Sequence, residues 1–537
     1  MIDRTLGVPN LRSRECANQV ERVLNGIPGV FGRVAFAEGV VRVAAQESIP
    51  DSELIAALRK AGFQAHRVDT EEPGPLRVVV IGGGPAATAA AVQAADSGAE
   101  VTVVERNDLG GTCINVGAVP SKLRLRAAET AFRPGKPAFD GISATVPEVD
   151  LGALIDQEKQ LAQSLGDCKF RQVLEDHPRI RWLRGSARLQ GRKLVTTETS
   201  EGSEELHADR ILLAVGAAPY VPPIDGLAAT PFWTSVDALE TQVIPEHLVV
   251  LGGGYVGVEM AQAFQRLGSR VTLITRRGLL ADMEPELGER LAAILAEEGM
   301  ALRLHTTIHS VSYQDGFSLE TRTGEILRGD RLLVAAGREP NTDGLGLEGA
   351  GVPTDRDGFI HVNERLQTDA EGIYAVGDCT DQNPRLVYVA AAAGARAATN
   401  MTGGFAELEL SLAPQVVFTD PQVASVGLTE REAREQDLDV EVRVLPLSQV
   451  PRAVINRDAR GVVKLVAERG GGRLLGAHLV AEGAGEVIQT ACLGLRYGIS
   501  VAELAGGIVP FLTMAEGLKL CAQRFSQELS RMPFCVD

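Results

Sequence analysis

Two strand–glycine-loop–helix units, at residues 77–105 and 247–275, constrain the fold of this chain more than any other feature of its sequence. The first reads RVVVIGGGPAATAAAVQAADSGAEVTVVE, and the second reads HLVVLGGGYVGVEMAQAFQRLGSRVTLIT. In each unit an apolar run of strand length ends in glycines, and a helix and a second apolar strand follow. This order is typical of parallel strands joined by a crossover helix, so we expect two α/β domains with helices covering a parallel sheet.

The glycine spacing of both loops indicates that each binds a nucleotide. The two patterns are Gly82-x-Gly84-x-x-Ala87 and Gly252-x-Gly254-x-x-Gly257. Glycines let the backbone approach a pyrophosphate, and the N-terminus of the following helix stabilises its negative charge. Because strand, loop and helix occur in register in both units, we predict two Rossmann-like nucleotide-binding domains.

The ends of the second strands distinguish the two expected nucleotides. Glu105 ends the first unit, where a carboxylate can accept hydrogen bonds from ribose hydroxyls. The second unit has no acid at that place and continues into Arg276 and Arg277. Arginine suits a 2′-phosphate, so the sequence favours NADPH over NADH. The alternative is that both arginines are only solvent-exposed surface residues, in which case the nucleotide could be NADH.

A chain of 537 residues is too long for one core, and its pattern divides it into several domains. Residues 1–70 alternate strand and helix patterns in the order βαββαβ, which fits a ferredoxin-like fold. The stretch DTEEPGPL is polar with Pro and Gly, which indicates a linker. The expected limits are 1–70 for the small domain, 71–76 for the linker, 77–222 and 341–405 for the first nucleotide domain, 223–340 for the second, and 412–537 for a C-terminal α+β domain.

Composition restricts the partners and the compartment. The formal net charge of −17 argues against nucleic acid or an anionic membrane as a partner, although it also serves solubility. The N-terminus has no apolar signal region and no apolar stretch is long enough to span a bilayer, so we expect a soluble, cytoplasmic protein. Seven dispersed cysteines without any Cys-x2-Cys do not form a disulfide framework or a structural zinc site.

The stretch GGTCINVGAVPSK contains half of a redox disulfide motif. Cys113 is present, but Ala118 stands where a second cysteine would complete Cys-x4-Cys. Two further stretches are near repeats of each other: ILLAVGAAPYVPP at 211–223 and LLVAAGREPNT at 332–342. They indicate that the chain leaves the two nucleotide domains through similar segments. In IYAVGDCTD, Asp378 follows a buried strand and precedes a small-residue helix.

On these motifs, residues 77–537 resemble the flavin-dependent pyridine nucleotide–disulfide oxidoreductases. The resemblance implies FAD and NADPH as cofactors, a head-to-tail homodimer built by the C-terminal domain, and a Lys122–Glu259 pair near the reactive atoms of the flavin. The residues that it implies for FAD are Gly82, Gly84, Ala87, Glu105, Gly111, Thr112, Lys122, Gly216 and Asp378. Those that it implies for the nicotinamide nucleotide are Gly252, Gly254, Gly257, Arg276, Arg277 and Gly337.

Within that family the run VPFLTMAEGLKLCAQRFSQ is similar to the mercuric reductases, which also carry an N-terminal metal-binding βαββαβ domain. Glutathione and dihydrolipoamide reductases carry a His-Pro-Thr run at this place, whose histidine is a general base paired with a glutamate five residues later. Glu516 is present here, but Phe511 occupies the place of the histidine, so that dyad is absent. The resemblance to mercuric reductases also aligns their tyrosine near the mercury site with Phe511. The resemblance implies paired thiolates that pass Hg(II), a soft ion that prefers two sulfurs. Each pair is broken here, at Ser13 and Cys16, at Cys113 and Ala118, and at Phe534 and Cys535.

The consequence differs between the two half-reactions. Hydride transfer from NADPH to FAD needs no sulfur, whereas Ala118 cannot close a disulfide with Cys113. Cys113 and Cys535 of the partner subunit remain as a candidate pair of metal ligands, and Cys16 is a weaker candidate. The alternative for each of these cysteines is that it is a vestigial residue without a metal-binding function. We expect Cys168, Cys379, Cys492 and Cys521 to be buried packing residues.

Three functional interpretations remain open from the sequence. The first is a mercuric reductase-like enzyme that reduces Hg(II) or another thiophilic acceptor. The second is a flavoprotein without a disulfide step, either a transhydrogenase or a donor to oxygen, a quinone or a protein. The third is a non-enzymatic flavin-binding partner protein. The sequence does not decide whether Ala118 is native or engineered.

Overall fold

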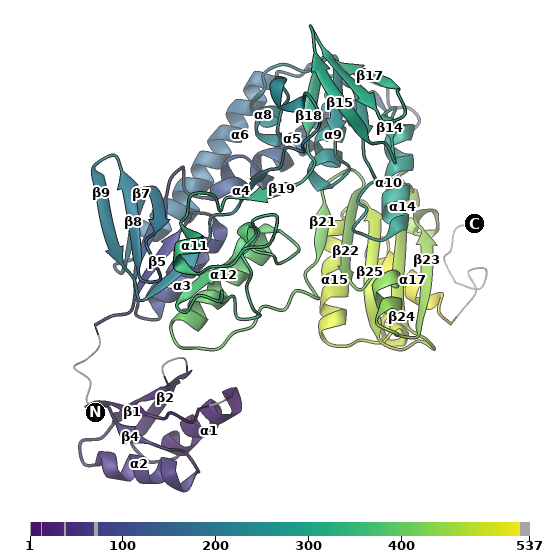
Figure 1. Cartoon of the computed structure of the whole chain (residues 1–537). Helices are drawn as coiled ribbons and strands as arrows, with labels where there is room; N and C mark the ends of the chain where they lie inside the picture. The colour runs from purple at the N-terminus through teal and green to yellow at the C-terminus, as the bar shows by residue number, and fades with distance from the viewer. Residues whose placement is uncertain (1, 12, 37–38, 69–73, 527–537) are drawn as a thin grey trace. The chain divides into compact units, whose positions relative to one another are not determined.

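The computed structural model describes residues 2–11, 13–36, 39–68 and 74–526. The chain divides into two compact units, each assembled from three separate stretches of sequence. The first unit comprises residues 1–111, 165–217 and 339–408, and the second comprises residues 112–164, 218–338 and 409–537. The helices and strands named below carry the labels of Figure 1.

An antiparallel four-stranded sheet with two helices forms the N-terminal part of the first unit (Figure 1, purple). Its strand order is β2-β3-β1-β4. Along the chain the elements are β1 (Ile2–Gly7), α1 (Arg14–Asn25), β2 (Val30–Ala35), β3 (Val40–Ala45), α2 (Asp51–Lys60) and β4 (His66–Arg67). Leu24 and Leu58, one from each helix, are fully buried against Leu6 of the sheet, so this part has its own apolar core.

A seven-stranded sheet forms the centre of the first unit, in the order β20-β10-β5-β6-β7-β8-β9. The strands from β20 to β7 run parallel, and β7, β8 and β9 continue the sheet as an antiparallel meander. Their bounds are β5 (Arg77–Ile81), β6 (Glu100–Glu105), β7 (Ile180–Leu189), β8 (Leu194–Thr199), β9 (Gly202–His207), β10 (Arg210–Leu213) and β20 (Ile373–Ala375). Residues 78–81 of β5 are all buried, as expected for a strand covered on both faces.

Small residues let the helices of the first unit approach this sheet and one another. Helix α3 (Pro85–Asp96) is rich in alanine, and a Cβ at Gly394 of α12 (Val387–Met401) would lie 2.0 Å from the carbonyl oxygen of Ala86. The two helices therefore cross at a distance that only glycine permits at position 394. The other helices whose residues lie wholly or partly in this unit are α4 (Gly111–Asn115), the π-helical segment Asp167–Arg171, α7 (Gln172–Glu175) and α11 (Leu347–Ala350).

Three sheets make up the second unit. A parallel sheet, β14-β13-β12-β18, contains the second glycine loop, and an antiparallel three-stranded sheet, β15-β16-β17, accompanies it. The C-terminal sheet is antiparallel, in the order β21-β22-β25-β24-β23. The bounds are β12 (His247–Leu251), β13 (Arg270–Ile274), β14 (Ala301–Arg303), β15 (Ile308–Tyr313), β16 (Phe317–Thr321), β17 (Ile326–Gly329), β18 (Arg331–Val334), β21 (Gln415–Val417), β22 (Gln422–Gly427), β23 (Val440–Pro446), β24 (Val462–Glu468) and β25 (Leu474–Ala481).

Helices cover the sheets of the second unit. They are α5 (Ala118–Phe132), α6 (Leu151–Gly166), α8 (Ser235–Glu240), α9 (Tyr255–Arg266), α10 (Pro285–Glu297), α13 (Glu430–Glu435), α14 (Pro451–Ile455), α15 (Ala484–Arg496), α16 (Val501–Gly506) and α17 (Glu516–Gln523). Two short strands, β11 (Ala217–Pro219) and β19 (Arg338–Pro340), lie at points in the sequence where one unit ends and the other begins.

A buried lysine joins two parts of the second unit that are far apart in sequence. Lys464, on β24, is only 2% exposed, and its ammonium lies 2.9 Å from Glu284 and 2.7 Å from Glu286 at the start of α10. It also lies 3.2 Å from Glu430 of α13. These carboxylates raise the pKa of Lys464 against the opposing effect of its burial. The C-terminal sheet is thereby tied to the second nucleotide-binding part.

One expectation about the cysteines was wrong. Cys379, Cys492 and Cys521 are buried, and burial raises the pKa of Cys379 to about 11 and of Cys521 to about 12. Cys168 is exposed, because it lies on the solvent side of a π-helical segment whose buried residue is Phe170.

Among the residues that the structure describes, no helix is both long enough and apolar enough to cross a membrane.

Candidate functional site

The first glycine loop connects β5 to α3 and leaves open space at the N-terminus of that helix. Gly82 has φ +116°, and a Cβ there would lie 2.2 Å from the carbonyl oxygen of Ala214, so only glycine fits. Gly84 caps α3 without a side-chain hydrogen bond, and the nearest atom to a Cβ at that position would be 3.9 Å away. Uncapped amides beside open space are the arrangement that a pyrophosphate requires, so the loop fits FAD.

Glu105 is held rigidly at the carboxyl end of β6. Its Oε2 accepts a hydrogen bond of 2.6 Å from the backbone N–H of Gly83, and its Oε1 accepts one of 2.7 Å from Asn107. Each carboxylate oxygen has a second lone pair, so the side chain remains able to accept from a ribose hydroxyl. The acid predicted from the sequence is therefore fixed beside the glycine loop.

The other residues that the sequence suggested for FAD in this unit follow the same sheet edge. Asp378 lies in a short turn directly after β20, and Gly216 (φ +66°) lies just after β10. Because the carboxyl ends of neighbouring parallel strands meet at one edge, these residues gather with Gly82 and Glu105. Ala87 is buried in the first turns of α3, and Gly111 (φ +57°) opens α4, with Thr112 next to it.

The second glycine loop connects β12 to α9 and repeats this geometry. Gly252 has φ +133°, and a Cβ there would lie 2.1 Å from the carbonyl oxygen of Ala335. A Cβ at Gly254 would meet no atom within 4 Å, whereas one at Gly257 would lie 2.0 Å from the oxygen of Gly252. Gly254 caps α9 without a side-chain hydrogen bond, so this loop also fits a pyrophosphate. Gly337 (φ +139°) follows β18 at the same sheet edge.

The two arginines after β13 have different surroundings. Arg276 is exposed, while Arg277 forms an ion pair of 2.9 Å with Asp282, both side chains being largely exposed. Thr275 occupies the place that Glu105 has in the first loop, since a Cβ at Gly253 would lie 2.9 Å from the Thr275 Cβ, as one at Gly83 would lie 2.8 Å from Glu105. The last residues of β13 and the two arginines that follow include no carboxylate. Asp282 pairs with Arg277 and not with Arg276.

Lys122 and Glu259 form a close ion pair between α5 and α9. The Lys122 Nζ lies 2.6 Å from Glu259 Oε2, and the Glu259 side chain is 4% exposed. The backbone N–H of Phe418 donates a hydrogen bond of 2.8 Å to Glu259 Oε1, so both carboxylate oxygens have a partner. The Lys122 Nζ also lies 4.9 Å from the centre of the Phe418 ring. The sequence had suggested the pair, but no local signal pointed to Phe418.

The incomplete disulfide motif spans a short helix and the start of a longer one. Cys113 lies in α4 and is half-buried, and Ala118 is the first residue of α5, after the cap Gly117. The hydroxyl of Ser121 donates a hydrogen bond of 3.2 Å to the Ala118 carbonyl oxygen. None of the six cysteines in the described part of the chain takes part in a disulfide.

In the N-terminal part, Ser13 has a structural role where a second thiol would be needed to hold a soft metal. Its hydroxyl caps α1 by accepting a hydrogen bond of 3.3 Å from the Cys16 N–H, and it lies 3.3 Å from the Cys16 Sγ. The structure brings no three His, Cys, Asp or Glu side chains together as a metal site anywhere in its described residues. The chemistry of this pair provides one soft sulfur ligand only.

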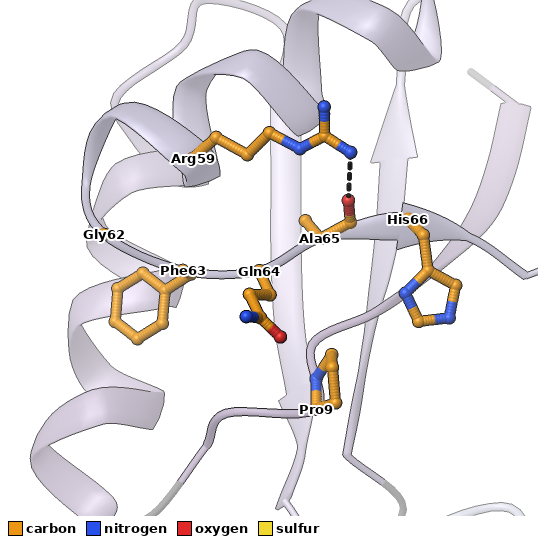
Figure 2. A pocket seen from close by; sticks show the side chains of 7 residues that line it. All are labelled: Pro9, Arg59, Gly62, Phe63, Gln64, Ala65 and His66. Atoms are coloured by element: carbon orange, nitrogen blue, oxygen red, sulfur yellow. Dashed lines mark hydrogen bonds between the residues drawn. The ribbon is translucent and has the colours of Figure 1, made fainter.

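A shallow cavity of about 540 Å³ lies elsewhere in this N-terminal part (Figure 2). Figure 2 shows Pro9, Gln64 and His66 bordering it, and the guanidinium of Arg59 donates a hydrogen bond of 3.1 Å to the Ala65 carbonyl oxygen. No cysteine lines this cavity, and His66 is the one histidine among its lining residues.

At the C-terminal end, Glu516 begins α17 with its Oε2 buried and without a hydrogen-bond partner. Burial raises the pKa of this carboxyl group. Phe511, five residues before Glu516, is 57% exposed. Phe534 and Cys535 lie outside the described residues, so the structure places neither of them.

Two dinucleotide loops, one followed by a carboxylate and one by arginines, together with a lysine paired to a buried glutamate, are the features expected of an oxidoreductase that binds two nucleotides. Residues 76–394 match the model of the pyridine nucleotide-disulphide oxidoreductases, and residues 413–522 match the dimerisation domain of that family. The chain belongs to the pyridine nucleotide-disulphide oxidoreductase family.

Similar proteins narrow the class further. A mercuric reductase of Acidithiobacillus ferrooxidans is 44% identical over 99% of this chain and 98% of its own length. One of Shigella flexneri is 43% identical over 99% of this chain and 100% of its own. Among solved structures, the HOCl-induced flavoprotein disulfide reductase RclA of Escherichia coli matches with a TM-score of 0.75 and 30% identity, over 83% of this chain and 99% of that one.

These comparisons confirm the predicted α/β fold and the resemblance to mercuric reductases within a family of enzymes that use FAD and NAD(P)H. The chain is an FAD-dependent oxidoreductase, and the non-enzymatic interpretation is set aside because the family is enzymatic. The dimerisation-domain match supports the homodimer.

Proposed function

We propose that this enzyme passes electrons from NADPH through FAD to a thiophilic acceptor such as Hg(II) held by thiolates, without the usual two-cysteine relay. The observation that carries the proposal is the contrast between the Lys122–Glu259 pair, which is intact at 2.6 Å, and the relay, which ends at Ala118. The full-length similarity to mercuric reductases supports the class of acceptor.

The residues of the two sheet edges would hold the cofactors. Gly82, Gly84, Glu105 and Asp378 are proposed for FAD, and the second loop with Arg276 is proposed for NADPH. FAD, when bound, supplies a carrier that takes two electrons as hydride and releases them to an acceptor. Arg276 supports NADPH over NADH, because an exposed guanidinium matches a 2′-phosphate.

Lys122 would place a fixed positive charge beside the carrier. Its ammonium is oriented by Glu259, whose carboxylate is buried and therefore held in one position. A preorganised cation in a partly desolvated site stabilises negative charge that develops during hydride transfer. This role requires no sulfur, so it is independent of Ala118.

Delivery of electrons to the acceptor would depend on thiols from two subunits. Cys113 would supply one sulfur and Cys535 of the partner subunit the other, because a soft ion such as Hg(II) prefers two thiolates. Cys16 would be a single ligand in the N-terminal part, where the Ser13 hydroxyl is used as a helix cap. That part would therefore not chelate a metal with two sulfurs of its own.

The second candidate function is favoured by Ala118 itself. If no thiol pair forms, the reduced cofactor would pass electrons directly to NAD(P)⁺, oxygen, a quinone or a protein. Such an enzyme would need the same two nucleotide sites and the same Lys122–Glu259 pair.

The two functions are separated by anaerobic NADPH oxidation of the FAD-loaded enzyme, with and without Hg(II) held as a bis-thiolate. Turnover that requires the metal supports the first function. Reduction of the bound flavin without any metal-driven turnover contradicts it and supports the second. The variant Cys535→Ser is expected to lower metal-driven turnover at least tenfold, while Cys168→Ser, at an exposed cysteine, is the matched control.

A gain-of-function variant tests the consequence of the missing second cysteine at position 118. Ala118→Cys is expected to create two additional NADPH-reducible thiols per chain, because a disulfide between Cys113 and the introduced thiol accepts two electrons and two protons to give two thiols. Counting free thiols before and after anaerobic reduction measures this. An unchanged count would show that Cys113 does not face residue 118.

A further inference from the structure

One polar face of helix α9 binds the segment that contains β21, at the start of the C-terminal sheet. Gln262 donates a hydrogen bond of 2.8 Å to the Asp420 carbonyl oxygen and accepts one of 2.8 Å from its N–H. The Arg266 guanidinium forms an ion pair of 2.8 Å with the Asp420 carboxylate. Tyr255, one turn before Glu259, donates a hydrogen bond to the side chain of Gln415. The segment 415–420 is thus held along the whole length of the helix that begins at the second glycine loop.

Phe418 is the residue of this segment that contacts both members of the Lys122–Glu259 pair. Its backbone N–H donates to Glu259 Oε1 at 2.8 Å, while its ring lies 4.9 Å from the Lys122 Nζ. The Lys122 side chain is 33% exposed, and Lys122 and Phe418 both line a cavity of about 350 Å³. The ammonium therefore has a carboxylate on one side, an aromatic ring on another and open space beside it.

The two contacts have different physical effects. The N–H of Phe418 satisfies the second oxygen of a buried carboxylate, which would otherwise be left without a partner. The ring attracts the ammonium through its quadrupole and displaces water from it without neutralising its charge. A cation held in one orientation by its neighbours acts more strongly on a nearby group than one that is free in water.

We propose that Phe418 is a positioning residue for the Lys122 ammonium in the hydride-transfer reaction, an inference that rests on the proposed function. The ring is 40% exposed, so burial in an apolar core is not what keeps an aromatic residue at this position. The segment 415–420 carries the ring, and α9 fixes that segment through Glu259, Gln262 and Arg266. The C-terminal sheet thereby sets the direction of the ammonium.

The experiment compares Phe418→Leu with Phe418→Tyr in the full-length, FAD-loaded protein. Both variants keep the backbone N–H that bonds Glu259, so only the ring is tested. Phe139→Leu removes a similarly exposed ring that has no contact with the pair and is the matched control. The readouts are the midpoint potential of the bound flavin and the anaerobic rate of its reduction by NADPH, with thermal unfolding measured alongside.

For Phe418→Leu we expect the ratio of reduced to oxidised flavin at a fixed potential to fall about threefold, the usual size of an exposed cation–π contact. This corresponds to a potential about 15 mV lower for a two-electron couple. Phe418→Tyr and Phe139→Leu are expected to match the parent. Should Phe418→Leu lose FAD, Phe418→Met keeps the bulk of the side chain and replaces it in the comparison.

Two results would overturn the inference. One is a potential in Phe418→Leu equal to that of the parent, and the other is an equal shift in Phe418→Tyr, which keeps the ring. A parent protein whose flavin is not reduced by NADPH would instead contradict the proposed function. The two failures are therefore distinguishable.

Discussion

The two nucleotide loops have the same strand–loop–helix geometry. They differ at the third position of the glycine pattern, which lies in the first turn of the helix, and at the end of the second strand. Ala87 has a methyl group where the second loop has Gly257, and at Gly257 such a methyl would lie 2.0 Å from a backbone oxygen. Glu105 bonds two backbone amides, whereas the equivalent Thr275 is followed by arginines. The first difference sets how closely helix and loop approach, and our proposal that the two loops recognise different ribose substituents rests on the second.

The largest effect is expected from placing a methyl group at the tighter loop. Gly257→Ala should destabilise the protein by about 1–3 kcal/mol and weaken NADPH binding at least tenfold, because the clash is with backbone. The reverse change, Ala87→Gly, creates no clash and should cost about 1 kcal/mol through helix propensity alone. Thermal unfolding and NADPH titration measure both. Equal behaviour of the two variants would mean that the loops are packed alike.

The next largest effect is expected at the carboxylate of the first loop. Glu105→Ala removes the acceptor of two backbone N–H groups. The Gly83 N–H is partly buried, and leaving it unsatisfied should cost about 1–3 kcal/mol, whereas the exposed Asn107 N–H can bond to water. The flavin-to-protein ratio of the purified variant should fall well below that of the parent. Glu100→Ala, at the exposed opposite end of the same strand, is the control and should retain its flavin.

Making the second loop resemble the first sharpens the comparison. Thr275→Glu places a carboxylate at the end of β13, where it would repel a 2′-phosphate and accept from a 2′-hydroxyl. The ratio of kcat/KM for NADPH to that for NADH should fall about tenfold or more, as expected for a like-charge contact. A ratio that does not move would show that this strand end does not meet the ribose.

The smallest effect distinguishes the two arginines. Arg276→Ala should raise the KM for NADPH about tenfold with little change for NADH, since one charge-assisted contact is lost. Arg277→Ala should stay within about twofold, because Asp282 already pairs this guanidinium at 2.9 Å. If Arg277→Ala has the larger effect, the phosphate contact is assigned to the wrong arginine.

Sequence patterns predicted the parts of this fold that depend on local periodicity. The glycine loops, Glu105 and the small-residue helix α12 could all be recognised because strand, turn and helix signals are contiguous there. The antiparallel extension by β8 and β9 was not foreseen, since its alternating strands resemble any surface hairpin. Cys168 was misplaced because an apolar neighbourhood in sequence does not say which side of a helix faces solvent.

The candidate site could be predicted only in part from the sequence, because contacts between residues that are far apart in the chain leave no local pattern. Lys122 and Glu259 were paired through the resemblance to a known family, although they are 137 residues apart. Phe418 and Lys464 act through side-chain contacts across long separations, and nothing adjacent to them in the chain signals those contacts. Their roles depend on how the C-terminal sheet meets helices α9 and α10, which periodicity does not specify.

The buried Lys464 has a consequence for how such enzymes exchange parts during evolution or in the laboratory. A chimera that replaced residues 409–526 alone with those of a relative lacking this lysine would leave Glu284 and Glu286 facing no cation. Removing one partner from a buried ionic cluster costs about 3–5 kcal/mol. The second nucleotide-binding part and the C-terminal sheet are therefore expected to be inherited together, as one exchangeable module whose boundary lies outside both.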